Sequence, residues 1–273
     1  MCRIFLSFDR PDNKTLVENF IKQAHLSYKK NTPHLPKNPR DNGPHTDGAG
    51  FAVLRPGKKW AIYKSVGQEF GQGFGQEFGQ GFRPQKNNLT IGHLRKKCPD
   101  YPGTISMQNT HPFLYRNHIM LHNGVLNVID QHPTKYKGWV APDLRKHIKG
   151  DTDSEILFFI YLTYMRKHRS NHDKNGGFYM IETLREVLAK FIKEGDEVSA
   201  NLIVSDGDFV LITRYLSSKK HKTPQHALSL YYDVCDGIVI SSEPVTEDYR
   251  VVPENMALLI DIKAETMVAY PIF

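Results

Sequence analysis

The stretch DTDSEILFFIYLTYM, residues 151–165, sets the fold class because it predicts a helix between two groups of strands. Thr152 and Glu155 match the capping box that begins a helix, and the run from Ile156 to Tyr164 supplies a broad apolar face. A second amphipathic helix is expected over residues 178–193, with Gly195 as its stop. The centre of the chain is therefore predicted to be helical.

Strand patterns flank these helices on both sides. Before them, an amphipathic helix is expected at about 14–29, and apolar runs predict strands at 2–8, 50–54, 60–64, 89–94 and 118–121. After them, two strands flank the hairpin signal Asp206-Gly207, and the predicted strands are 201–204, 209–215, 256–262 and 267–272. Because few β-α-β units occur, we predict antiparallel sheets with helices packed outside, an α+β sandwich. We see no linker, so residues 1–273 are expected to form a single domain.

Residues 67–82 form a tandem repeat in which Gly-Gln-Glu-Phe and Gly-Gln-Gly-Phe each occur twice. A glycine in every copy makes a stable helix costly, and a four-residue period is too short for a solenoid. We favour a low-complexity surface loop inserted before the strand at 89–94. The alternative is a lid that covers a nearby cleft with Phe70, Phe74, Phe78 and Phe82.

Composition narrows the class of protein. The chain of 273 residues has 36 Lys+Arg against 29 Asp+Glu and is 40% hydrophobic, which excludes a disordered or fibrous protein. The basic residues lie in short scattered clusters, so a solvated surface is favoured over nucleic-acid binding. The 3 cysteines cannot build a disulfide framework, and the longest apolar run falls well short of the ~20 residues that a bilayer requires. We expect a cytoplasmic protein without a signal peptide or a membrane span.

Cys2 is the candidate nucleophile because of its place in the chain. Removal of Met1 would leave one residue with both a thiol and a free α-amine. An α-amine has a pKa of about 8, so it can serve as the base that activates the thiol. The alternative is that Cys2 is only a small apolar residue at the start of a strand.

Attack of a thiol on an amide needs donors for the oxyanion and groups that bind the substrate. Asn123 and Gly124, directly after the apolar residues 119–121, offer a side-chain and a backbone N–H, although Asn-Gly is also a common turn. Arg95 suits an α-carboxylate through a bidentate pair, or is an ordinary surface charge. Asp153 suits an α-ammonium, or caps its helix.

Six short motifs occur in a fixed order along the chain. They are Met1-Cys2-Arg3, Asp47-Gly48-Ala49-Gly50-Phe51, His93-Leu94-Arg95, Asn109-Thr110-His111-Pro112-Phe113, His122-Asn123-Gly124 and Thr152-Asp153-Ser154-Glu155. In this series the chain resembles the class II glutamine amidotransferases. It is most similar to their stand-alone, single-domain group, which includes γ-glutamyl amide hydrolases of ergothioneine synthesis and glutathione breakdown. Segments of the C-terminal half resemble that group as well, so the resemblance covers nearly the whole chain.

The resemblance implies a four-layer αββα fold of the N-terminal nucleophile hydrolases. It implies that Cys2 is the nucleophile and that Asn123 and Gly124 form the oxyanion hole. It further implies that Arg95 binds the α-carboxylate of the substrate and that Asp153 binds its α-ammonium.

Further residues of these motifs have alternative interpretations. His93 and His111 line up with family histidines near the site, where a structural hydrogen bond is at least as good an interpretation as catalysis. The segment 47–50 either lets backbone pass close to the cleft or is a tight turn before a strand. Arg95 is followed by Lys96-Lys97-Cys98-Pro99, where the family has a small residue and Thr, so the carboxylate loop is expected to differ in shape or specificity.

Together these residues predict a cysteine amidohydrolase that acts on glutamine or a γ-glutamyl amide through a γ-glutamyl thioester. Neither a metal nor an organic cofactor is expected. One alternative is a glutaminase subunit that delivers ammonia to a separate synthetase partner. Another is a catalytically silent binding protein on the same fold. Basal activity separates the first two, and salt-dependent nucleic-acid affinity without thiol reactivity would support the third.

Overall fold

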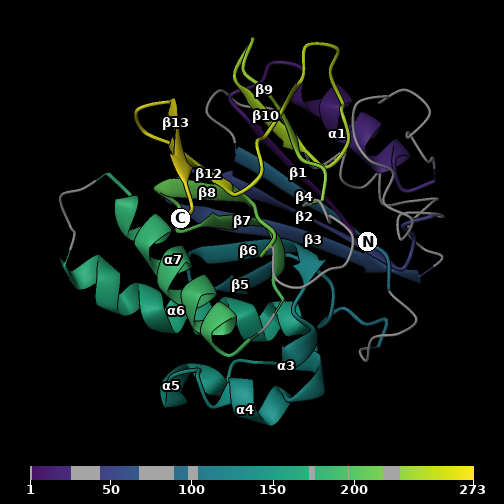
Figure 1. The fold of residues 1–273 in the computed structure, drawn as a ribbon. Helices are drawn as coiled ribbons and strands as arrows, with labels where there is room; N and C mark the ends of the chain where they lie inside the picture. The colour runs from purple at the N-terminus through teal and green to yellow at the C-terminus, as the bar shows by residue number, and fades with distance from the viewer. Residues whose placement is uncertain are drawn as a thin grey trace, which may run out of the picture. The chain divides into compact units, whose positions relative to one another are not determined.

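The computed structural model describes residues 2–25, 44–67, 89–97, 104–171, 176–195, 197–217 and 228–273. The chain divides into two compact units, and each contains one antiparallel sheet (Figure 1). The first unit comprises residues 1–99, 105–112 and 228–252, and the second comprises 100–104, 113–227 and 253–273. The predicted repeat, apart from Gly67, lies outside the described residues. The prediction of a single domain stays a prediction.

The first unit contains a seven-stranded sheet in the order β11-β9-β10-β1-β4-β2-β3. Its strands are β1 Arg3–Phe8, β2 Gly48–Arg55, β3 Lys59–Val66, β4 Leu89–Arg95, β9 Tyr231–Asp233, β10 Ile238–Ser241 and β11 Arg250–Val251. Strand β1 lies between β4 and β10, and every residue of β1 and β4 is buried. The start of the chain is therefore held in the interior of this sheet.

Helix α1, Asn13–Lys22, covers this sheet with one apolar face. Phe20 is central to the contact, because its ring stacks on Phe5 at 5.0 Å and meets Phe51 edge-on at 6.0 Å. The prediction of a helix to residue 29 was wrong at its end, because the backbone turns after Lys22 and the residues that follow bond three positions back. Residues 26–29 lie outside the described residues.

The second unit contains a six-stranded sheet in the order β13-β12-β8-β7-β6-β5. Its strands are β5 Phe113–Tyr115, β6 His118–Val125, β7 Ser199–Ser205, β8 Phe209–Arg214, β12 Met256–Asp261 and β13 Thr266–Pro271. Its helices are α3 Asn127–Gln131, α4 Pro133–Lys137, α5 Pro142–Arg145, α6 Asp153–Asn171 and α7 Phe178–Lys193. The predicted hairpin at Asp206-Gly207 and the pairing of β12 with β13 are confirmed.

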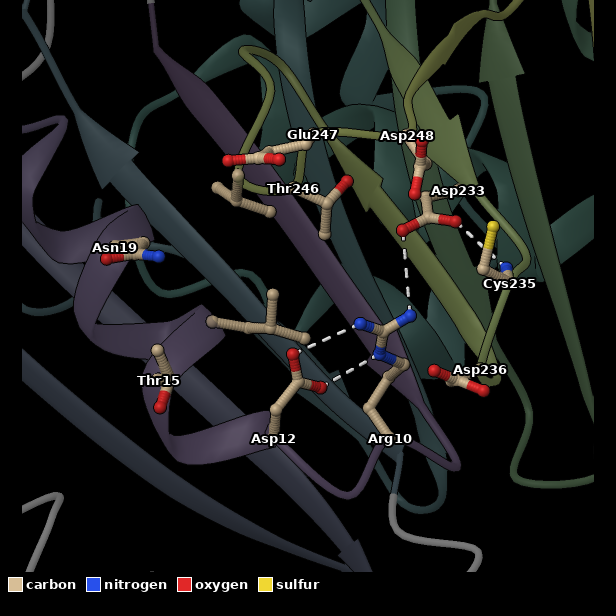
Figure 2. Close-up of a pocket in the computed structure, with 12 residues that line it drawn as sticks. Arg10, Asp12, Thr15, Asn19, Asp233, Cys235, Asp236, Thr246, Glu247 and Asp248 are labelled. Carbon is tan, nitrogen blue, oxygen red and sulfur yellow. Dashed lines mark hydrogen bonds and ion pairs between the residues drawn. The ribbon is translucent and has the colours of Figure 1, made fainter.

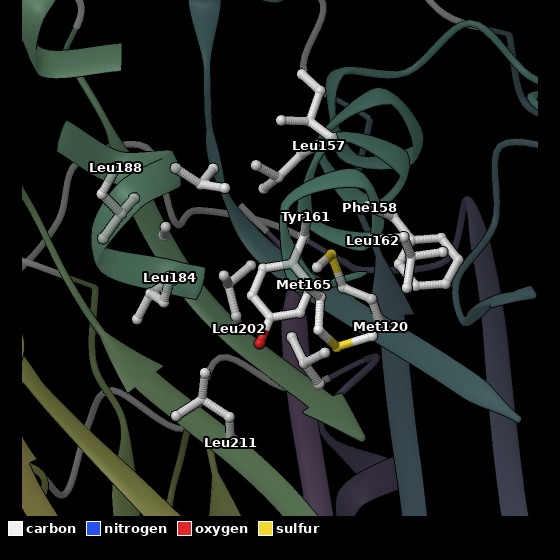
Figure 3. Packing of buried hydrophobic residues seen from close by; sticks show 14 of the residues in the cluster. Met120, Leu157, Phe158, Tyr161, Leu162, Met165, Leu184, Leu188, Leu202 and Leu211 are labelled. Atoms are coloured by element: carbon white, nitrogen blue, oxygen red, sulfur yellow. The ribbon is translucent and has the colours of Figure 1, made fainter. Parts of the chain in front are cut away.

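The core of the second unit lies between its sheet and the helices α6 and α7. Figure 3 shows Leu157 and Tyr161 of α6 and Leu184 of α7 beside Leu202 and Leu211 of the sheet. Burial of these apolar side chains, at about 25 cal/mol per Å², is the main stabilising term in this unit. The predicted helices at 151–165 and 178–193 are thus confirmed as the elements that cover the sheet.

The start of α6 differs from a closed capping box. The hydroxyl of Thr152 accepts a hydrogen bond from the Glu155 N–H at 3.3 Å, as predicted. The Glu155 carboxylate instead accepts from the N–H groups of Lys149 at 2.9 Å and Gly150 at 2.6 Å. The acidic side chain therefore orders the preceding loop. In the part of the chain that the structure describes, no helix is long and apolar enough to cross a membrane.

Candidate functional site

Cys2 lies at the end of the central strand of the first unit. Arg3 pairs with Leu94 of β4, so the register continues to Cys2 beside Arg95. The residue is half buried, and its Sγ lies 3.7 Å from the carbonyl oxygen of Lys96. The thiol is thus held by the backbone that follows β4, with part of its surface open to solvent.

Arg95 is buried in the same region, with 7% of its surface exposed. Its Nη1 finds no hydrogen-bond partner among the described residues. The backbone around it is fixed, because the Asp47 N–H donates to the Arg95 carbonyl at 3.1 Å and Asp47 Oδ2 accepts from the Lys97 N–H at 2.7 Å. A buried guanidinium N–H without an acceptor costs free energy, so this group suits an anionic ligand. Cys98 lies outside the described residues.

Two glycines of β2 allow the segment before Phe113 to approach the sheet. A β-carbon at Gly50 would lie 1.9 Å from the His111 carbonyl oxygen, and one at Gly48 would lie 2.9 Å from the Thr110 hydroxyl oxygen. The prediction of a close backbone approach at 47–50 agrees with this packing, and the alternative of a tight turn does not, because β2 begins at Gly48. The predicted histidines meet here: the rings of His93 and His111 are buried and 4.1 Å apart.

The Asn123-Gly124 pair lies inside a strand of the second unit. The predicted strand 118–121 was too short, because Asn123 pairs with Asn201 and Gly124 with Ala200, so β6 continues to Val125. The alternative of a turn at Asn-Gly is therefore wrong. Asn123 is buried, and alternation along the strand directs its side chain to the face opposite that of its neighbours.

Gly124 is suited to a donor role by its place in the sheet. The Ala200 N–H donates to Tyr215 at 2.9 Å on the β8 side, so Gly124 and Ala200 form a non-hydrogen-bonded pair across β6 and β7. The Gly124 N–H then points away from β7, to the side where β5 pairs only with residues 118–120. A β-carbon at Gly124 would lie 1.9 Å from the Ser199 carbonyl oxygen, so only glycine fits.

Asp153 connects the first residues of α6 to the end of β6. Its Oδ2 accepts the Leu126 N–H at 2.9 Å and its Oδ1 accepts the Ser154 hydroxyl at 2.9 Å. Asp130 of α3 accepts the backbone N–H of Asp153 in return. Burial, together with the charges of Asp153 and Asp151, raises the pKa of Asp130 to about 7. Asp153 therefore serves α3 as a cap, while its own helix is capped by Thr152.

The residues predicted from sequence thus form two groups. Cys2, His93, Arg95 and His111 belong to the first unit, and Asn123, Gly124 and Asp153 belong to the second. Sequence reasoning assigned no role to His122, Ser154 or Asp130, although the first two lie inside quoted motifs next to predicted site residues. Among the described residues, no group of three or more His, Cys, Asp or Glu could hold a metal ion.

A cavity of about 260 Å³ in the first unit contains none of the predicted residues (Figure 2). In it, Arg10 binds Asp12 through two hydrogen bonds of 2.9 and 3.1 Å and lies 3.6 Å from Asp233. The exposed Cys235 also lines this cavity, and its hydrogen bond with Asp233 and that group's charge raise the pKa of the thiol. Since the thiolate is the reactive form, Cys235 is a poor nucleophile here.

Comparison with known proteins connects these features to a family. Residues 37–234 match the family model described as glutamine amidotransferases class-II. The probable glutamine amidotransferase DUG3 of Saccharomyces cerevisiae (strain ATCC 204508 / S288c) is 26% identical over 224 residues, which cover 68% of this chain. The chain spans 60% of the length of that curated relative.

Solved structures agree in fold. A glutamine aminotransferase class-II domain protein from Silicibacter pomeroyi has a TM-score of 0.59 and 18% identity, over 82% of this chain and 90% of that one. An allosteric regulatory enzyme of purine biosynthesis has a TM-score of 0.63 and 16% identity, over 100% of this chain and 49% of that one. These likenesses, with the two antiparallel sheets and their helices, confirm the α+β N-terminal nucleophile hydrolase fold. Because the matched segment covers well over half of the sequence, the chain belongs to the class II glutamine amidotransferases.

Proposed function

We propose that this protein hydrolyses the side-chain amide of glutamine, or a γ-glutamyl amide, with the thiol of Cys2 as the nucleophile. The observation that carries the proposal is that a half-buried Cys2 lies one residue beyond the Arg3–Leu94 pair, next to Arg95, whose buried Nη1 finds no partner among the described residues. A substrate α-carboxylate would bind this guanidinium through two parallel hydrogen bonds. Membership of the family supports the same reaction class.

The reaction follows from the chemistry of an N-terminal cysteine. Once Met1 is removed, the α-amine of Cys2 takes the thiol proton and the thiolate attacks the γ-carbonyl carbon. The tetrahedral intermediate expels ammonia or an amine, which takes a proton from the ammonium group, and a γ-glutamyl thioester remains. Water, deprotonated by the same amine, then breaks the C–S bond, so that glutamate leaves and the thiol is restored.

The second unit supplies the remaining groups in this proposal. The Asn123 side chain and the Gly124 N–H bind the oxyanion, and the direction of that N–H away from β7 supports the assignment. Asp153 binds the α-ammonium with the lone pairs that its two hydrogen bonds leave available. We assign His93 and His111 a supporting role, because their rings lie 4.1 Å apart, tilted by 33°, in the interior of the first unit.

Intact mass before and after treatment with a glutamine-analogue diazoketone tests the proposal. We expect loss of Met1 and one adduct in the wild type, and no adduct in Cys2→Ala. Cys235→Ala is the matched control and should keep the adduct, because the raised pKa of that thiol makes it a poor nucleophile. An adduct that persists in Cys2→Ala and disappears in Cys235→Ala would overturn the proposal.

A second candidate is a glutaminase subunit that passes its ammonia to a separate synthetase. The observation that favours it is that the chain covers 49% of the glutamine phosphoribosylpyrophosphate amidotransferase from B. subtilis, at a TM-score of 0.58 and 17% identity. About half of that B. subtilis enzyme therefore lies outside the part that matches this chain. Ammonia release from glutamine by the purified protein alone favours the hydrolase, and release only after addition of a partner favours the subunit.

A further inference from the structure

His122 has no part in the chemistry above, although it directly precedes Asn123 and is only 2% exposed. Its Nε2 lies 3.1 Å from the Ser199 carbonyl oxygen, and its Nδ1 lies 2.9 Å from the Ser154 hydroxyl oxygen. The same hydroxyl oxygen lies 2.9 Å from Oδ1 of Asp153. All four residues belong to the second unit, so a continuous chain of contacts joins β7 to Asp153.

These three contacts need one hydrogen atom each. A carbonyl oxygen and an ionised carboxylate only accept, so the Ser199 carbonyl and Asp153 supply none. The Ser154 hydroxyl supplies one O–H, which it donates to Asp153, and the His122 ring lies between Ser154 and the Ser199 carbonyl.

The direction of these contacts follows from the Ser154 hydroxyl. It donates to Oδ1 of Asp153, so its oxygen accepts from the Nδ1–H of His122. The Leu126 N–H meets the other carboxylate oxygen at 2.9 Å. The imidazole ring therefore sets the direction in which the hydroxyl points.

We propose that His122 is a positioning residue that orients the Asp153 carboxylate through the Ser154 hydroxyl. This inference rests on the proposed function, in which Asp153 binds the substrate α-ammonium. With Oδ1 held by Ser154 and Oδ2 held by Leu126, the carboxylate has one orientation and keeps its remaining lone pairs for the ligand. Without the Ser154 bond it would rotate, and the preference for an α-ammonium would fall on the order of tenfold, as expected for one charge-assisted hydrogen bond.

The decisive measurement compares glutamine with glutaramate, which is glutamine without its α-amino group. The ratio of the two kcat/KM values, followed by ammonia release, reports recognition of the ammonium. Ser154→Ala should lower this ratio about tenfold relative to the wild type, mainly through KM for glutamine. Asp153→Asn, which removes the carboxylate charge, should give the largest decrease in this ratio. Thr183→Val, which removes a buried hydroxyl that donates to the Tyr179 carbonyl, is the control and should leave the ratio unchanged.

Two variants of His122 distinguish positioning of the Asp153 carboxylate from a contact that only stabilises the fold. His122→Asn keeps a donor near the Nδ1 position, and its ratio should stay close to the wild-type value because the side chain still reaches Ser154. His122→Gln keeps a donor near the Nε2 position, toward Ser199, and should lower the ratio of the two kcat/KM values as Ser154→Ala does. The reverse order, or equal losses for both substrates in every variant, would overturn the proposal.

The position of the ring hydrogen of His122 is measured independently of activity. With ¹⁵N-labelled histidine, Nδ1 of His122 should carry a directly bonded hydrogen, as the donor to Ser154. A bare Nδ1 would overturn the inference whatever the enzyme does. A wild type that hydrolyses neither amide would instead refute the proposed function, and an unchanged ratio in Asp153→Asn would refute only the role of that carboxylate.

Discussion

We expect Asp130→Asn to remove a pH-dependent loss of stability from the second unit. Burial and the charges of Asp153 and Asp151 raise the pKa of Asp130 from its ordinary value of 3.8 to about 7. Between these two values the unfolded chain has released the proton while the folded protein keeps it. Stability therefore falls as the pH rises from about 4 to about 7, and it levels off above that.

The size of this effect follows from the gap between the two pKa values. At about 1.4 kcal/mol per pH unit, a gap from 3.8 to about 7 gives a ceiling of about 4 kcal/mol. Asp130 is only partly buried, and solvent screening reduces the effect to on the order of 2 kcal/mol. Asn at this position still offers an oxygen to the Asp153 N–H but carries no charge. The variant should thus exceed the wild type by about 2 kcal/mol at pH 8, or roughly 5 °C in melting temperature.

Thermal unfolding followed by circular dichroism at pH 4, 6 and 8 tests this expectation. The wild type should lose melting temperature across this range relative to Asp130→Asn, and the two should nearly coincide at pH 4. Asp143→Asn is the control, because the hydrogen bonds from Arg166 lower the pKa of that exposed carboxyl instead of raising it. Parallel melting curves for wild type and Asp130→Asn at all three pH values would refute the reasoning.

Three further substitutions have definite outcomes. Gly50→Ala should lower the free energy of unfolding by on the order of 3 kcal/mol in urea unfolding, since its β-carbon would lie 1.9 Å from the His111 carbonyl oxygen; a value within about 0.5 kcal/mol of wild type contradicts the close approach. Arg95→Lys should raise KM for glutamine at least tenfold in steady-state ammonia release, because Lys cannot form the bidentate pair. Tyr161→Phe should cost about 1 kcal/mol in urea unfolding, the value of its 3.0 Å hydrogen bond to the Met180 carbonyl.

The fold was predictable where apolar periodicity and turn chemistry agree. The helix α7 and the hairpin at Asp206-Gly207 carry both signals, and both were predicted within about two residues. Strands β9, β10 and β11 were missed because they contain only three, four and two residues, too few for a period to show. Their pairing with each other and with the distant β1 makes them strands.

In the candidate site, as in the fold, features that depend on contacts between distant residues could not be predicted from the local sequence. Asn123-Gly124 carries a turn signal in sequence, yet pairing with β7, more than seventy residues later, makes it a strand. Five of the seven site residues came first from the chemistry of their residue types, and His93 and His111 came from the resemblance to a family; all seven roles stay predictions. His122 gave no local signal, because its partners Ser154 and Ser199 lie 32 and 77 positions away. Asp130 likewise has an ordinary helical context and becomes unusual only beside Asp153.

Two hydrogen-bonded routes connect Asp153 to the strand that holds Asn123 and Gly124. The first is direct, from Oδ2 to the N–H of Leu126, which follows β6 immediately. The second passes through Ser154 to the side chain of His122 within β6. A shift of α6 relative to β6 would therefore disturb both bonds at once. Under the proposed function, the carboxylate that binds the ammonium and the donors that bind the oxyanion are held as one rigid group, so a substitution that loosens either route should impair recognition before it impairs folding.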